Sequence, residues 1–201
     1  ANIGTVTTNS GLYGVANTVA SIGTSSNWFN NLYTVNATHS ALTVTGSFVP
    51  SSNASVNIGS SSAWFNTIWG TSSHALYADL AEKYESDQQY TPGTVLVFGG
   101  EHEVTISNEM NTTRVAGVVT TNAAYTMNSA LEAEHVADIA LQGRVPCKVV
   151  GQVRKGDMMV SAGNGAARAE ANPKIGTVIG KALGTYSGDG VGVIEVVVGR
   201  I

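Results

Sequence analysis

Two different hydrophobic patterns divide the chain. From residue 91 onward, short apolar runs alternate with glycine-rich turns, as in GTVLVF, TRVAGVVTT, RVPCKVV, DMMVSAG and GVIEVVVGRI. Runs of this length, rich in valine and bounded by glycine, are typical of β-strands. The pattern therefore predicts a compact β-barrel or β-sandwich domain over residues 91–201.

Glycine-containing turns separate these predicted strands. Gly99-Gly100 stands between GTVLVF and HEVTI, and a second turn is expected at residues 163–165, Gly-Asn-Gly. Asp189-Gly190 precedes the last apolar run. Glycine and asparagine adopt the positive φ angles that tight hairpins need, so all three sites are predicted turns.

The segment before this domain has a different period. Its apolar side chains recur at helical spacing: Leu76, Tyr77, Leu80, Ala81 and Tyr84. Pro92-Gly93 would stop a helix. We therefore expect a junction over residues 75–90 that contains one short helix near 75–85.

The first part of the chain, residues 1–74, repeats a phrase. SIGTSSNWFNNLY begins at Ser21 and NIGSSSAWFNTIW begins at Asn57. Repeated units of this size cannot bury their apolar faces alone. Three chains wound about one axis could pair their edges and bury the aromatics, which predicts an interwoven trimeric β shaft. Its expected core residues are Ile22, Trp28, Phe29, Leu32, Ile58, Trp64, Phe65 and Ile68.

An alternative for the aromatic residues is a platform for a sugar, for which Tyr33 and Trp69 are the better candidates. The charge distribution favours the shaft. No Asp, Glu, Lys or Arg precedes Asp79, so all fourteen acids and ten bases lie from Asp79 onward. About a quarter of a typical chain is charged, so the neighbours of this chargeless part are expected to be copies of itself.

Composition also bears on other partners. The net charge of −4 and the lack of a basic stripe argue against nucleic acid. No apolar run approaches the roughly 20 residues that cross a bilayer, so membrane insertion is not expected. Cys147 is the single cysteine, and its place in an apparent strand predicts a small buried side chain.

Candidate chemistry is sparse, and no catalytic residue is assigned with a familiar motif. If the chain cleaves itself, Asp79 and Glu82 at the junction are the candidate acid and base, although at helical spacing they also fit a solvated face. His39 and His74 occupy similar places in the repeat. They are weak metal candidates, because no metal-ligand spacing surrounds them. We expect no metal site and no cofactor.

The order of phrases along the chain carries a resemblance. IGSSSAWFNTIW is followed by ALYADLAEKYES, YTPGTVLVFGG, TRVAGVVTTNAAYTMNS, IALQGRVPCKV and VRKGDMMVSAGNGAARA. This order resembles the C-terminal region of bacteriophage tail-fibre and appendage proteins of the marine and cyanobacterial type. It is more distantly similar to the self-cleaving domains of peptidase family G2, which act as intramolecular trimerisation chaperones. The residues that correspond to that family's motif are Tyr77-Ala78-Asp79 and Ala81-Glu82, with an inexact match.

The resemblance implies an all-β virion protein, a homotrimeric fibre component that presents or forms a host-attachment tip. Its partners would be its own copies, other virion proteins and a glycan or protein receptor on the host surface. Receptor-binding residues are unknown, and turns at 107–113, 121–131 and 162–165 are candidates by composition. Two alternatives stay open, an autoproteolytic chaperone that drives trimerisation and a capsid or virion decoration protein.

Overall fold

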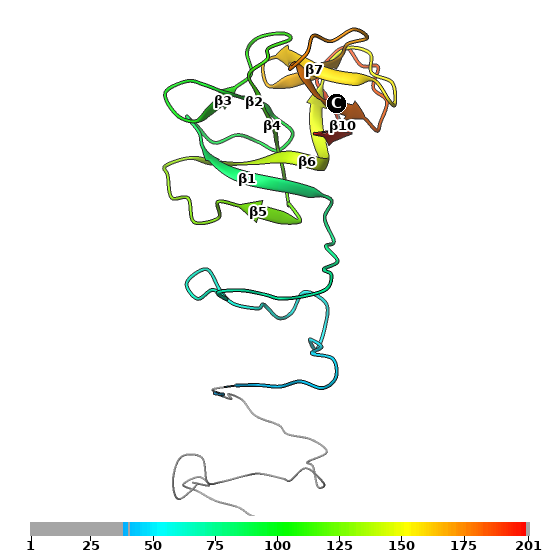
Figure 1. Ribbon diagram of the computed structural model, residues 1–201. Coiled ribbons are helices and arrows are strands. Elements are labelled where there is room, and N and C mark those ends of the chain that lie inside the picture. Colours follow the sequence, from blue (N-terminus) through cyan, green and yellow to red (C-terminus); the bar gives the residue numbers. More distant parts are fainter. Residues whose placement is uncertain (1–37, 40, 200–201) are drawn as a thin grey trace, which may run out of the picture. The chain divides into compact units, whose positions relative to one another are not determined.

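The computed structural model describes residues 38–39 and 41–199, and the chain divides into two units, residues 1–68 and 69–201 (Figure 1). All regular elements of the described part are β-strands, and they lie in the second unit. The strands are β1 Asp79–Glu85, β2 Val95–Phe98, β3 Val104–Ile106, β4 Val115–Val119, β5 Tyr125–Met127, β6 Val136–Val149, β7 Met158–Gly163, β8 Ala166–Ala169, β9 Val178–Ala182 and β10 Gly192–Val198. Within the described residues, no helix is long and apolar enough to cross a membrane.

Five strands close into a barrel. The hydrogen-bonded order runs β6, β8, β7, β9, β10, and β10 returns to pair antiparallel with β6. The pairing of β10 with β6 covers the whole of β10, from Gly192 opposite Val149 to Val198 opposite Gly143. The predicted β-barrel is thus confirmed, and the closure leaves these strands without an open edge at that seam.

Strand β6 links the barrel to a second group of strands (Figure 1). Its second half carries β10, whereas its first half pairs with β1 and β4. Strand β4 continues the sheet to β2 and β3, and β5 lies in parallel beside β1. The sequence pattern predicts RVPCKVV as a strand of its own, but this run lies at the end of one 14-residue strand that passes through Gly143.

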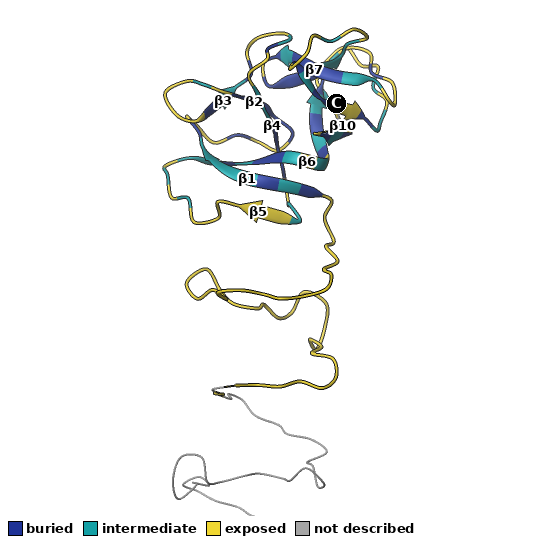
Figure 2. Ribbon diagram, viewed as in Figure 1, coloured by how far each residue is buried: buried dark blue, intermediate teal, exposed yellow. Residues whose placement is uncertain are grey.

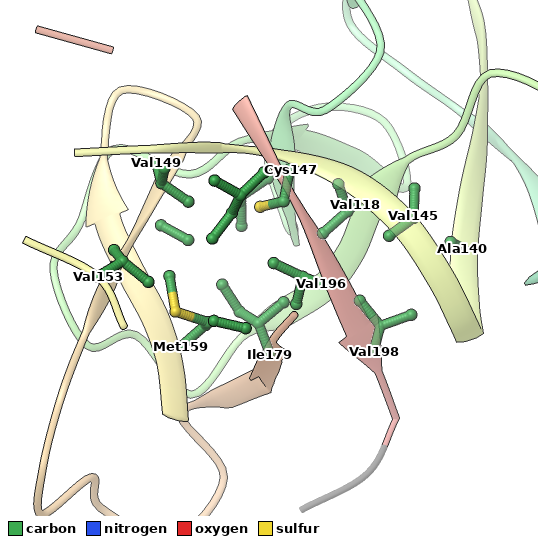
Figure 3. Packing of buried hydrophobic residues seen from close by; sticks show 14 residues of the cluster. Val118, Ala140, Val145, Cys147, Val149, Val153, Met159, Ile179, Val196 and Val198 are labelled. Atoms are coloured by element: carbon green, nitrogen blue, oxygen red, sulfur yellow. The ribbon is translucent and has the colours of Figure 1, made fainter. Parts of the chain in front are cut away.

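Two apolar clusters fill the interior. The larger one lies inside the barrel, and Figure 3 shows Cys147, Met159, Ile179 and Val196 converging there. The smaller cluster includes Leu96 from β2, Val104 from β3 and Ile139 from the first half of β6. Both sets come from the alternating positions of the strands, because successive side chains point to opposite faces. Cys147 is fully buried, as its sequence context predicts.

The Cys147 thiol is expected to be inert in the folded protein. Burial raises its pKa to about 12, and only the thiolate reacts with disulfide reagents. An aromatic disulfide reagent at pH 8 should therefore label Cys147 only as fast as the protein unfolds, and at once in denaturant. Rapid labelling of the native protein would contradict the closed barrel.

The predicted turns at 99–100 and 163–165 are confirmed. Gly99 and Gly100 connect β2 to β3 with φ angles of 138° and 87°. The β7–β8 hairpin turns at Asn164, which has a φ of 51°. The glycines on either side of it also have positive φ angles. Asp189-Gly190 lies in the longer loop ahead of β10.

The short helix expected near 75–85 is wrong. Residues Asp79–Glu85 form β1, which pairs antiparallel with β6 along its whole length and parallel with β5. The apolar spacing fitted a helix, but it fits a strand equally over so short a run, and pairing with two neighbours decides the outcome. Part of the expected junction therefore belongs to the sheet of the second unit.

A buried tyrosine connects the segment after β1 to β3. Tyr90 is 7% exposed, and its hydroxyl donates to Asp87 Oδ1 at 2.5 Å and accepts from the Ile106 N–H at 3.0 Å. Thr105 Oγ1 donates to Asp87 Oδ2 at 2.8 Å. Burial alone would raise the pKa of Asp87, but these hydrogen bonds outweigh it and the pKa is lowered.

Replacing Tyr90 with phenylalanine should destabilise the second unit by about 1–3 kcal/mol, because the Ile106 N–H loses its acceptor. Since the pKa of folded Asp87 lies below its unfolded value, the Asp87 contribution is present above about pH 4 and is lost as the pH falls through the folded pKa. Urea unfolding of both proteins at pH 7 and pH 3 tests this, with a smaller difference expected at pH 3.

The described part of the first unit is open to solvent. Residues 41–68 are all exposed, and Figure 2 draws them in yellow. Their local contacts include a bridge between Ser60 and Ala63 and a hydrogen bond from Trp64 Nε1 to the Ser61 carbonyl at 3.1 Å. Within these residues no longer strand forms in the single chain. The interwoven shaft therefore stays a prediction about several chains together.

Candidate functional site

Asp79 is the first residue of β1 and its carboxylate is an anomaly. The residue is 5% exposed, and its Oδ2 atom is buried with no hydrogen-bond partner among the described residues. An unpaired buried carboxylate oxygen costs folding free energy, so it is usually avoided. Because Asp79 was already a candidate for self-cleavage, this unpaired oxygen makes it the centre of the candidate site.

Hydrogen bonds hold the two peptide units that flank Asp79. The Arg144 N–H donates to the Ala78 carbonyl at 3.1 Å, and the Ala124 N–H donates to the Asp79 carbonyl at 2.9 Å. Arg144 belongs to β6, where Asp79 lies opposite Gly143 in the β1–β6 pairing. The Ala78–Asp79 bond is therefore held through its carbonyl by β6, whereas Ala124, which precedes β5, holds the following peptide unit.

Ala78 also borders a pocket of about 510 Å³ on this side of the barrel. Three basic residues line it, Arg144, Lys155 and Lys181. All three are exposed, so water and anions can reach the pocket. The Ala78 side of the peptide bond is thus open to solvent, whereas Asp79 is covered.

Glu82, the second candidate for self-cleavage, is not beside Asp79. In a strand, residues three apart point to opposite faces, whereas a helix would have placed them together. Tyr84, two residues on, donates a hydrogen bond to Glu82 Oε2 at 2.7 Å. Burial, this hydrogen bond and the negative charges of Glu82 and Glu103 raise the pKa of Tyr84 to about 12. Glu82 therefore pairs with Tyr84 on the opposite face.

The two histidine candidates, His39 and His74, are exposed. Among the residues that the structure describes, no group of three or more histidine, cysteine, aspartate or glutamate side chains is placed to hold a metal ion.

Half of the predicted shaft core can be located. Ile58, Trp64, Phe65 and Ile68 are 68%, 71%, 61% and 76% exposed in the single chain. The other four, Ile22, Trp28, Phe29 and Leu32, lie outside the described residues. Contiguous apolar side chains at this exposure are a feature of association surfaces.

The three candidate receptor turns differ in accessibility. Segment 121–131 contains β5 and is mostly exposed, with Tyr125 and Met127 at 55% and 40%. Segments 107–113 and 162–165 meet each other through a bridge between Met110 and Ala162. Ser107 and Thr112 are buried in the first of these segments, but Asn108, Glu109, Met110 and Thr113 are exposed there. In the second segment Asn164 is exposed and both glycines are buried.

Sequence reasoning identified Asp79 but missed the residues that hold its peptide bond. Gly143 interrupts an otherwise continuous strand pattern, and an isolated glycine in a strand can mark the close approach of another backbone. That signal was present in the text IALQGRVPCKV. The hydrogen bonds from Arg144 to the Ala78 carbonyl and from Ala124 to the Asp79 carbonyl join residues distant in sequence, for which no local signal exists.

No family model matches this chain, and no curated protein matches it. Among solved structures, the fold is similar to the crystal structure of the pre-mature bacteriophage phi29 gene product 12. The TM-score is 0.50 and the sequences are 14% identical. The match covers 66% of this chain and 23% of the phi29 chain, so this chain corresponds to less than a quarter of its neighbour. At this identity the similarity concerns the β fold.

Proposed function

We propose that this chain is a homotrimeric component of a bacteriophage virion fibre. The observation that carries the proposal is the chargeless, aromatic first unit, whose described apolar residues are left in water by the single chain. Association of copies would remove this apolar surface from solvent. The fold similarity to a bacteriophage gene product supports the same setting.

The oligomeric state tests this proposal directly. Sedimentation equilibrium of the 201-residue chain at micromolar concentration should give the mass of a trimer, three times 20.7 kDa. A compact monomer at that concentration would overturn the proposal.

The fibre component would form or present a host-attachment tip. Segment 121–131 is the best placed of the candidate turns, because its residues are exposed around the edge strand β5. Partners would be other virion proteins and a glycan or protein receptor on the host surface. Three copies on one axis would raise a weak affinity through multivalency.

A second candidate function, autoproteolysis at the Ala78–Asp79 bond, is favoured by the unpaired carboxylate of Asp79. The second unit would then act as a chaperone that assembles the trimer and separates from it. The similar bacteriophage protein is described as pre-mature, and a processing step in this chain would agree with that description.

The chemistry needs only water as a co-reactant. A carboxylate oxygen of Asp79 attacks the carbonyl carbon of Ala78, and the bond from that carbon to the Asp79 nitrogen breaks. The nitrogen takes a proton from water and leaves as an amine. Water from the adjoining pocket then hydrolyses the resulting anhydride, which restores the Asp79 carboxylate and gives Ala78 a free carboxylate.

A time course of the purified chain tests this second function. We expect denaturing gels and mass spectrometry to show fragments 1–78 and 79–201 accumulating at a rate independent of added protease inhibitors. A single intact chain after days at neutral pH would overturn autoproteolysis and leave the trimeric fibre proposal in place.

A further inference from the structure

We infer that Gly143 and Arg144 form a cradle for the Ala78 carbonyl, in which Gly143 sets its position and the Arg144 N–H stabilises the oxyanion formed during cleavage. This inference rests on the second candidate function above, cleavage between Ala78 and Asp79. It assigns a positioning role to a glycine and a catalytic role to one backbone amide of β6.

The first observation concerns the room at residue 143. A Cβ atom there would overlap the Ala78 carbonyl oxygen and lie 2.8 Å from the Cα of Asp79. Real Cβ contacts are longer, so any side chain at 143 would force the start of β1 away from β6. Its φ of +107° is also a conformation that favours glycine. Both the space and the backbone angle therefore require glycine where the bond is held.

The second observation concerns the Arg144 amide. Its N–H lies 3.1 Å from the Ala78 carbonyl oxygen, the atom that becomes negatively charged when the carbonyl carbon is attacked. A donor fixed in advance at such an oxygen lowers the barrier without reorganisation. Because Arg144 belongs to a strand paired with β1 and β10, the donor is held rigidly.

The third observation links the cradle to the pocket. Ala78, Gly143 and Arg144 all line the 510 Å³ pocket, together with Lys155 and Lys181. The pocket gives water access to the Ala78 carbonyl after attack. Its positive charges also favour the new Ala78 carboxylate over the reverse reaction. One segment of β6 thus positions the Ala78 carbonyl, donates to its oxyanion and borders the pocket next to the new carboxylate.

Gly143→Ala tests the position of the carbonyl. We expect the first-order cleavage rate to fall at least about 100-fold, the scale that a displacement of about 1 Å costs an oriented reaction. Gly151→Ala is the matched control, because Gly151 also has a positive φ, 73°, but nothing lies within 4 Å of its Cβ position. Gly151→Ala should introduce the same kind of backbone strain and still cleave at the wild-type rate.

A backbone ester tests the donor and does not depend on whether Gly143→Ala folds. Replacing Arg144 by its α-hydroxy acid removes only the N–H and should slow cleavage about 10²- to 10³-fold. The same exchange at Lys148, whose N–H donates to the Gly93 carbonyl at 2.9 Å, is the control in the same strand. Both esters should lower the urea midpoint similarly, but only the one at 144 should slow cleavage.

The outcomes separate the two proposals. If the wild-type chain never divides, both the proposed autoproteolysis and the cradle are overturned. A wild-type chain that divides, together with a 144 ester that divides equally fast, overturns the cradle and keeps autoproteolysis. Slow cleavage in the 144 ester, with wild-type rates in the 148 ester and in Gly151→Ala, supports the cradle.

Discussion

The Asp79→Asn variant is expected to stay intact under conditions in which the wild-type chain divides into fragments 1–78 and 79–201. Asparagine keeps the shape of the side chain, but its neutral amide oxygen cannot replace the carboxylate as a nucleophile. Losses of about 10⁴-fold or more are usual when a catalytic side chain is removed. Mass spectrometry after several wild-type half-lives measures the difference.

A second readout separates catalysis from folding. The unpaired Oδ2 atom of Asp79 costs free energy in the native state. Removing the negative charge should therefore leave the urea midpoint unchanged or raise it, as happens when functional groups are removed from strained sites. Asp138→Asn is the matched control. It makes the same exchange at a carboxylate that has a partner, since Asp138 Oδ1 lies 4.0 Å from Lys83 Nζ. Wild-type cleavage in Asp79→Asn would contradict the assignment.

Glu82 decides whether the reaction is complete within one chain. In the single chain its carboxylate accepts the Tyr84 hydroxyl at 2.7 Å, on the face of β1 opposite to Asp79. If Glu82→Gln also loses cleavage, a neighbouring copy must supply that carboxylate, and the rate of the wild type should then fall on dilution below the trimer dissociation constant. A rate that does not depend on concentration assigns the reaction to Asp79 and water.

The second unit could be predicted from sequence because its signals are local. Glycine turns at 99–100 and 163–165 and alternating apolar runs specify strands and hairpins without knowledge of their partners. The segment 79–85 could not be assigned in this way. Its residues fit two periods, and only its pairing with β5 and β6 excludes the helix.

The same difference explains the candidate site. Asp79 could be singled out because it is the first charged residue and lies in a recognisable phrase. The burial of its carboxylate is a property of the folded chain, and the contact of Ala78 with Arg144 joins residues far apart in sequence. Glu82 was grouped with Asp79 through their closeness in sequence and the resemblance, and the strand β1 places the two side chains on opposite faces.

The double variant Trp64→Ser and Phe65→Ser should abolish the trimer. Both side chains are mostly exposed in the single chain, at 71% and 61%, so a shaft would bury them only between copies. A fully buried large apolar side chain contributes about 1.5–3 kcal/mol, and each trimer would lose two from every chain. Such a sum reaches about 10 kcal/mol, and sedimentation at micromolar concentration should change from the mass of a trimer to that of a monomer.

A control on the second unit makes this result specific. Val193→Ser removes an apolar side chain from β10 that is 60% exposed, close to the value for Phe65. If the shaft holds the chains together, Val193→Ser stays trimeric and the double variant becomes monomeric. The urea midpoint of the double variant should not change, because residues 41–68 contribute no buried side chains to the single chain. If the double variant stays trimeric, Trp64 and Phe65 do not hold the chains together, and their place in the predicted shaft core is wrong.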